Sequence, residues 1–320
     1  MESSNHELLL PLVQEENICL PLPINVVSKY WNINLPIEEA LETAKQYPSN
    51  TGSVLIEGIE LAERNGLVCK IRHSSLPELK KIIDNGIPPI VILPGIPEIT
   101  QHASIISGYD ETENTILHYI QKGTQEGEQQ EGAIPQKIFD KEWSEDGRLL
   151  IILAPTDIVS SLNIPPNLDE ESNRLCFISE KLNLQKNTNE ALETLKKAVN
   201  LDSTNFTALH LLAGTLNSQN SEDCIKYYQK SIELNKQYFL SYNGLGNFYL
   251  KSNQFEKAEP CYTKAIEINP KRSARIYKNR AYLREKQQKN LEAKDDLKNY
   301  LKLSPKAKDR GIIEQAIREL

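Results

Sequence analysis

The chain has 320 residues, of which 39% are hydrophobic and 25% are charged, and its net charge at pH 7 is −7. This length suits two domains better than one core. No apolar run of about 18 residues predicts a membrane-spanning helix, and the first residues, MESSNHELLLPLV, lack the features of a secretory signal. The acidic charge argues against non-specific nucleic-acid binding and favours basic clients.

The cysteines are few and widely separated. Five are present, with no CxxC pair, at Cys19, Cys69, Cys176, Cys224 and Cys261. This pattern is typical neither of a disulfide framework nor of a thiolate zinc site. We therefore expect reduced cysteines, a cytoplasmic protein, and no metal or other cofactor.

The first half of the sequence predicts helices followed by strands. Helical spacing of apolar residues covers 24–31, 37–46, 52–67 and 75–86, and short β-branched runs cover 88–94, 103–110, 115–120 and 148–155. This order predicts an α+β domain over residues 1–155 with a largely antiparallel sheet. The polar, glycine-rich segment 122–132 is expected to be a mobile surface loop.

The second half predicts a repeated helical structure. Residues 156–171 contain a Pro-Pro step and acidic residues, as expected of a linker. Beyond it, four segments align on the small residues Ala191, Cys224, Ala258 and Ala293, at intervals of 33, 34 and 35 residues. A period near 34 with this pattern resembles the tetratricopeptide repeat (TPR). The resemblance implies an all-α solenoid over 172–320, with about four repeats and a capping helix.

A TPR solenoid implies a polypeptide substrate or protein partner, bound on its concave face. The first-helix residues on that face are predicted to include Asn243, Asn247, Asn279 and Arg280. Amide and guanidinium groups suit recognition of peptide backbone or carboxylate. A merely solvated surface is the alternative reading of the same residues.

The stretch QEENICLPLP, residues 14–23, places Cys19 just before a predicted helix. Pro21 and Pro23 suit the first turn, where a missing N–H costs little. A helix N-terminus lowers the pKa of a thiol, because its free N–H groups stabilise the thiolate. Gln14 could offer an amide N–H to a developing oxyanion. Cys19 is therefore either a nucleophile or a small buried hydrophobic residue.

A thiol nucleophile needs a histidine as its base. Of the five histidines, His6 lies in an N-terminal tail expected to be disordered, His73 in a short connection, and His210 in a repeat helix. His102 instead opens the predicted strand HASIISGYD. It is the candidate base.

Four segments, LVQEENICLP, PPIVILP, HASIISGYD and FDKEWSEDGRLLIILAP, together resemble the papain-like cysteine peptidases that remove double-glycine leaders from bacteriocins. The resemblance is closer to relatives in which such a domain precedes TPRs. It implies a papain-like α+β fold over the first domain. It also implies Cys19 as nucleophile, His102 as general base and then acid, and Gln14 as oxyanion donor.

Two positions depart from the family pattern. Leu20 stands where the family has glycine, and Tyr119 stands where it has the aspartate that orients the histidine. A phenol cannot supply the negative charge that stabilises an imidazolium. Tyr119, His118 or Gln121 is left as the residue that orients His102.

Three functional hypotheses follow. The first is a cysteine peptidase, or a related thiol-dependent acyl-transfer enzyme, whose TPR half docks a polypeptide. The second is a catalytically inactive pseudo-peptidase that serves as an interaction protein. The third makes the whole chain an assembly scaffold that does not use a groove.

Overall fold

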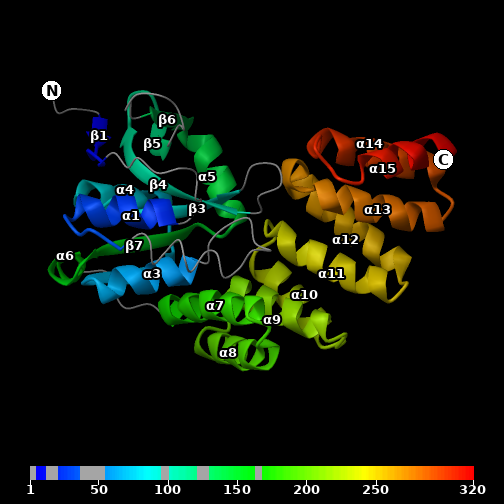
Figure 1. The fold of residues 1–320 in the computed structure, drawn as a ribbon, viewed down its shortest axis with the longest axis horizontal. Helices are drawn as coiled ribbons and strands as arrows, with labels where there is room; N and C mark the ends of the chain where they lie inside the picture. Colours follow the sequence, from blue (N-terminus) through cyan, green and yellow to red (C-terminus); the bar gives the residue numbers. More distant parts are fainter. Residues whose placement is uncertain (1–4, 12–20, 37–54, 95–100, 121–129, 163–167) are drawn as a thin grey trace. The chain divides into compact units, whose positions relative to one another are not determined.

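The computed structural model describes residues 5–11, 21–36, 55–94, 101–120, 130–162 and 168–320. They belong to two compact units, which meet in the sequence between Asp202 and Ser203. The first unit is a β-sheet covered by helices, and the second, over 203–320, is built from helices (Figure 1).

The sheet of the first unit is antiparallel throughout the pairings that the structure describes. Its strands follow the order β2 (Leu67–His73), β7 (Leu149–Pro155), β3 (Ile90–Pro94), β4 (Gln101–Asp110), β5 (Thr115–Ile120) and β6 (Gln130–Pro135). The expected α+β class with an antiparallel sheet is confirmed, whereas a papain-like fold stays a prediction.

Helices cover both faces of this sheet. They are α1 (Pro21–Tyr30), α3 (Leu55–Arg64), α4 (Leu76–Asp84) and α5 (Gln136–Glu145). Successive side chains of a strand point to opposite faces, so β7 contributes side chains to two hydrophobic cores. Ile151 joins Ile24 of α1 and Ile59 of α3 in the first core, whereas Ile152 joins Ile82 of α4 and Phe139 of α5 in the second core.

Local sequence signals explain where these elements end. Ser75 caps α4 by accepting a hydrogen bond from the backbone N–H of Glu78. The expected helix over 52–67 ends at Arg64 instead, because Gly66 adopts a positive φ of 94° and Leu67 begins β2. The expected helix over 37–46 lies outside the described residues.

The segment 122–132, expected to be a loop, is partly a strand. Residues 121–129 lie outside the described part, but β6 begins at Gln130 and pairs with β5. The loop prediction is therefore wrong from residue 130 onwards. Its polar composition concealed the strand because the register of β6 is set by β5 rather than by an apolar pattern of its own.

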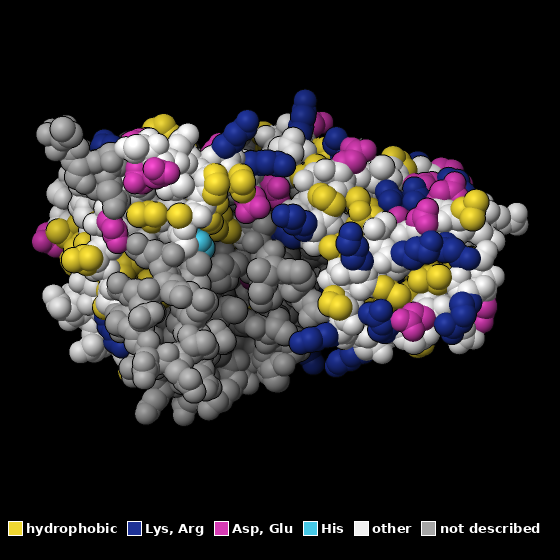
Figure 2. All heavy atoms as spheres, turned by 90° about the horizontal axis from the view of Figure 1, so that it is seen from above, with side chains coloured by type: hydrophobic (Ala, Val, Ile, Leu, Met, Phe, Trp, Pro, Cys, Tyr) yellow, Lys and Arg dark blue, Asp and Glu magenta, His cyan; other side chains and the backbone are white. Residues whose placement is uncertain are grey.

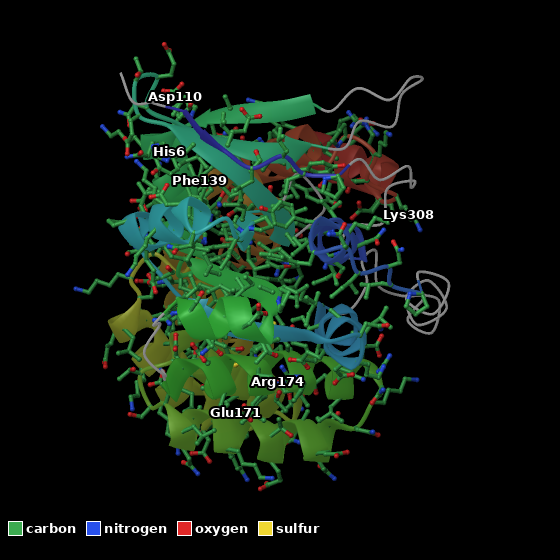
Figure 3. All side chains as sticks on the ribbon, turned by 90° about the vertical axis from the view of Figure 1, so that its left-hand side faces the viewer. His6, Asp110, Phe139, Glu171, Arg174 and Lys308 are labelled. Atoms are coloured by element: carbon green, nitrogen blue, oxygen red, sulfur yellow. The ribbon has the colours of Figure 1, made fainter. Side chains whose placement is uncertain are left out.

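The N-terminal tail is also ordered where the structure describes it. β1 (Asn5–Glu7) pairs with β4 beside residues 108–110. His6, which is labelled in Figure 3, stacks on Tyr109 with ring centroids 4.5 Å apart, and its Nδ1 lies 2.8 Å from an Asp84 carboxylate oxygen. A side chain at Gly108 would collide with the backbone of His6. Disorder was the wrong prediction for this segment, because specific contacts outweigh its polar composition.

The expected linker, 156–171, is largely helical. It holds α6 (Thr156–Ser161) and the first residues of α7 (Leu168–Leu184). Val159 and Leu162 are buried in the second core, and Asp169 accepts a hydrogen bond of 2.8 Å from the backbone N–H of His73. The described residues of this segment therefore pack with the first unit, and the Pro-Pro step lies outside the described part.

The first helix pair, α7 and α8 (Thr188–Leu201), belongs to the first unit. Arg174 of α7, which is labelled in Figure 3, binds Glu63 of α3, with Nη1 and Oε1 2.8 Å apart. Glu170 lies 3.3 Å from the ammonium of Lys70 in β2. These ion pairs and the packing of α7 on the sheet join α7 and α8 to the described residues of the first unit.

The second unit contains three further helix pairs and a last helix. The first helices of the pairs are α9 (Phe206–Ser218), α11 (Phe239–Lys251) and α13 (Ala274–Lys286). The second helices are α10 (Cys224–Leu234), α12 (Phe255–Ile268) and α14 (Asn290–Leu303), and α15 (Arg310–Glu319) follows. Together with α7–α8 they form four helix pairs and a terminal helix, in the order expected of the repeats.

Small residues allow these helices to approach closely. Ala258 and Cys224, two of the small residues on which the repeats align, are fully buried at equivalent positions. A Cβ added at Gly244 would lie 2.5 Å from the ring of Tyr228, and one at Gly246 would lie 2.7 Å from the ring of Tyr262. The two glycines therefore leave room for the tyrosines between successive helices.

Candidate functional site

The predicted catalytic residues fall mainly outside the described part of the chain. Gln14, Cys19 and Gln121 are outside it, and so is the side chain of His102. The backbone of His102 lies in β4 opposite Leu93 of β3. The pairing of Cys19 with His102 therefore stays a prediction.

The two described candidates for the orienting residue lie on opposite faces of the sheet. His118 pairs with Ile106, a residue of the second core, and its Nδ1 is 3.3 Å from the hydroxyl of Ser104. Tyr119 packs against the first core, on the face that α1 covers. Only one of them can therefore share a face with any given catalytic group.

The described cysteines are poor nucleophiles. Burial raises the pKa of Cys224 and of Cys261 to about 11. It also raises the pKa of Cys69 and of Cys176. All four thiols therefore stay protonated at neutral pH, and protonated thiols react slowly.

The first helices of the second unit share one pattern of exposed and half-buried positions. α9, α11 and α13 each have 13 residues. In each, the second, fifth, ninth and thirteenth residues are exposed or half-buried, and spacings of three and four residues place them on one side of a helix. We call this the first-helix face; its residues are Thr207, His210, Gly214, Ser218, Leu240, Asn243, Asn247, Lys251, Arg275, Lys278, Tyr282 and Lys286.

Side-chain hydrogen bonds hold the three first helices side by side. His210 Nδ1 of α9 lies 3.1 Å from the hydroxyl of Ser241 in α11. Asn279 of α13 donates to Asn247 of α11 over 3.0 Å. Burial lowers the pKa of His210 to about 4, so its imidazole is neutral at pH 7. The first-helix face is thus a defined surface and not a set of independent helices.

The predicted binding residues divide into two groups. Asn243 and Asn247 lie on the first-helix face. Asn247 also accepts a hydrogen bond of 2.8 Å from Tyr262, which ties it to α12. The Oδ1 atom of Asn243 is buried and accepts no hydrogen bond from the described residues. This oxygen is therefore not open to a ligand on the first-helix face.

Arg280 is committed to the packing of the last repeat. Its guanidinium forms two hydrogen bonds with the Asp296 carboxylate of α14, at 2.9 and 2.7 Å, and a third with Thr263 at 2.9 Å. Arg284 also binds Asp296, at 2.9 Å, and only 8% of Arg280 is exposed. Arg280 therefore stabilises the repeat from inside and does not belong to the first-helix face.

Sequence reasoning missed the exposed side of α13. Arg275, Lys278, Tyr282 and Lys286 are spaced three, four and four residues apart, which is the signal that places them on one side of a helix. Half of the Tyr282 surface is exposed, at 51%. The predicted pair, Asn279 and Arg280, follows Lys278 directly and turns away from that side.

Charge is divided unevenly along the chain. Residues 203–320 contain 21 Lys and Arg against 13 Asp and Glu, whereas residues 1–202 contain 16 against 31. Dark blue Lys and Arg side chains are accordingly spread over the second unit in Figure 2, with fewer acidic side chains between them. The net acidity that favours basic clients is thus a property of the first unit and not of the repeats.

The described residues include no group of three or more His, Cys, Asp or Glu side chains able to hold a metal ion. None of the helices formed by the described residues is long and apolar enough to cross a membrane.

The comparisons with known proteins concern the repeats. Residues 239–272, from α11 to the turn after α12, match the tetratricopeptide repeat family. Anaphase-promoting complex subunit 3 of Schizosaccharomyces pombe is 31% identical over 103 residues, which are 32% of this chain and 15% of that protein. The STIP1 homolog of Dictyostelium discoideum is 31% identical over 110 residues, which are 32% of this chain and 19% of that protein. The chain therefore contains tetratricopeptide repeats, and it spans less than a fifth of the length of these two relatives.

Solved structures of two other proteins are also similar. PilF of Pseudomonas aeruginosa is 19% identical, with a TM-score of 0.43, over 48% of this chain and 71% of that one. MamA is 24% identical, with a TM-score of 0.39, over 53% of this chain and 92% of that one. At these TM-scores neither structure bears on the function of this chain.

Proposed function

We propose that this chain is a protein-interaction protein whose tetratricopeptide repeats bind a polypeptide across the first-helix face. Repeated helix pairs create extended surfaces of this kind. The repeat match over 239–272 supports the proposal, and so does the similarity to a protein named as a subunit of a complex. The first unit then supports the repeats, or adds a second binding surface, without chemistry of its own.

The first-helix face carries this proposal. Its positions are mostly polar, and many of the positions between them are buried in the repeats. Asn243 and Asn247, in the middle helix, add amide groups to this face. An asparagine amide can donate a hydrogen bond to a peptide carbonyl. The face therefore offers hydrogen-bond donors to an extended chain.

Peptide binding by the full chain tests the proposal. Three fluorescent pools of short random peptides, one acidic, one neutral and one basic, would be titrated with the protein. We expect at least one pool to bind, and Asn243→Ala to weaken that binding by about three- to tenfold, the effect of one hydrogen bond. The matched control is Gln229→Ala, which removes an exposed amide from α10. Absence of binding by all three pools would overturn the proposal.

A cysteine peptidase is the second candidate. It rests on the resemblance of the segments that contain Cys19 and His102 to papain-like peptidases. Under this proposal Cys19 attacks a peptide carbonyl, His102 protonates the leaving amine, and water releases the acyl-enzyme.

Thiol labelling separates the two candidates. A peptidase requires Cys19 to react with iodoacetamide below pH 8 and faster than the four described thiols, whose pKa values burial raises. His102→Ala should then slow the labelling of Cys19 alone. Equal, slow labelling of all five cysteines would exclude the peptidase and leave the interaction protein.

A further inference from the structure

The exposed residues of α13 form a basic row that differs from the rest of the first-helix face. This row, the α13 stripe, consists of Arg275, Lys278, Tyr282 and Lys286. Matching positions on α9 carry no Lys or Arg, and those on α11 carry one, Lys251. Positive charge therefore increases along the face toward the last repeat.

Two of the three basic groups in the stripe lack an acidic partner. No Asp or Glu among the described residues pairs with Arg275 or Lys286, whereas Lys278 binds Asp309. Lys286 instead lies over the ring of Tyr282, 5.2 Å from its centroid. Inside the same repeat, by contrast, Arg280 and Arg284 share the Asp296 carboxylate. The stripe thus holds cations that the repeat itself does not neutralise.

We propose that the α13 stripe binds an acidic polypeptide segment in an extended conformation, a specification that rests on the proposed peptide-binding function. Residues four apart on a helix are about 6 Å apart along its axis. In an extended chain, side chains on the same side belong to every second residue and are about 7 Å apart. Successive carboxylates can therefore meet the cations in turn, with an apolar side chain between them against Tyr282.

The geometry favours a polypeptide over a nucleic acid. A nucleic-acid site commonly contacts about 6–10 phosphates with basic groups. The stripe offers three, and Asp309 already binds one of them. Glu285 is also exposed beside the stripe and would repel a continuous phosphate backbone. A segment with separated carboxylates avoids that repulsion.

Fluorescence anisotropy with the full chain tests the proposal. The probe is a synthetic peptide in which glutamates and serines alternate on each side of one leucine. Control probes replace the glutamates by lysine or glutamine, and a single-stranded oligothymidine represents nucleic acid. We expect the acidic peptide to bind at least about tenfold more tightly than either peptide control, with affinity falling as salt shortens the screening length.

Paired charge reversals identify the site. Arg275→Glu with Lys286→Glu should weaken binding of the acidic peptide by at least about tenfold, because attraction becomes repulsion at both ends. The matched control, Lys230→Glu with Lys302→Glu, makes the same change in net charge on exposed residues of second helices and should change affinity less than about twofold. Tyr282→Ala should weaken binding severalfold without altering its salt dependence.

Other outcomes would overturn the proposal in distinguishable ways. Equal losses in the two double variants would show attraction by net charge and no site on α13. Tighter binding of oligothymidine, lost in the stripe variant, would make the stripe a nucleic-acid site. Preference for the neutral or basic pool, with Asn243→Ala still weakening binding, would refute the acidic ligand but retain the proposed function. Absence of peptide binding of any kind would refute both.

Discussion

The two units of this protein are stabilised by contacts of different range. In the first, strands distant in sequence are neighbours: β2 pairs with β7, about eighty residues later, and α7 packs on both β2 and α3. In the second, each helix packs on the helices before and after it, as when Arg280 of α13 binds Asp296 of α14. The first unit should therefore fold as a whole, while damage to the second should stay near its origin.

This contrast bears on function. A binding surface made of repeats can change at one helix without disturbing the others, which suits a face whose charge rises from α9 to α13. A catalytic site between α1 and β4 would instead depend on the whole first unit, because both elements contribute to the same core.

Shortening the first unit should have the largest effect. A fragment of residues 1–155 lacks α7, so Arg72, which is only 7% exposed and lies 3.5 Å from Glu170, loses that partner, and Ile56 loses its packing against α7. We expect this fragment to be unfolded or insoluble and a fragment of 1–202 to unfold cooperatively, as measured by circular dichroism during heating. A stable fragment of 1–155 would show that α7 is dispensable.

A buried carboxylate should matter most in the second unit. Asp296→Asn leaves Arg280 and Arg284 without their shared carboxylate, which costs about 3–5 kcal/mol in comparable buried pairs. Asp295→Asn, one residue earlier, removes an exposed pair with Lys298 and should cost about 1 kcal/mol or less. Urea unfolding would measure both. Similar losses in the two variants would contradict a structural role for Asp296.

Acid should weaken the second unit through His210. Its pKa is lowered to about 4 by burial, so between about pH 6.5 and 4 the unfolded chain binds a proton that the folded chain does not. Stability should fall over this window by at most about 3 kcal/mol. His210→Gln should flatten the fall, seen as a smaller change in melting temperature between pH 7 and pH 4.5. An unchanged slope in that variant would assign the acid sensitivity elsewhere.

Close helix packing provides the smallest expected effect. Gly244→Ala places a methyl group 2.5 Å from Tyr228 and should destabilise the second unit by about 1–3 kcal/mol. Gly311→Ala meets no atom within 4 Å and should be neutral or stabilising by up to about 1 kcal/mol, because alanine favours a helix. Loss of stability in both variants would show that replacing a helical glycine is itself destabilising, and that the contact with Tyr228 is not the cause.

The repeats were more predictable from sequence than the sheet domain was. Ala258 and Cys224 recur at a fixed interval, and the structure buries both because each repeat solves the same packing problem. β6 was not predicted because its pairing with β5, and not an apolar pattern of its own, sets its register. α6 was not predicted because Val159 makes its apolar contacts only once the second core has formed.

The candidate site was predicted in part. Asn243 and Asn247 do lie on the first-helix face, since residues four apart share a side of a helix. Arg280 does not, because whether an arginine faces solvent or a carboxylate depends on Asp296, sixteen residues later. The catalytic proposal for Cys19, His102 and Gln14 still rests on the resemblance alone.

The position of β1 has a practical consequence for handling the protein. Asn5–Glu7 hydrogen-bonds to the second half of β4, where it covers backbone groups that would otherwise be open to pairing. Removal of the first ten residues, by proteolysis or by cloning, would leave that stretch free to recruit strands from other molecules. Self-association of a trimmed preparation would then reflect a lost internal strand and not a natural oligomer.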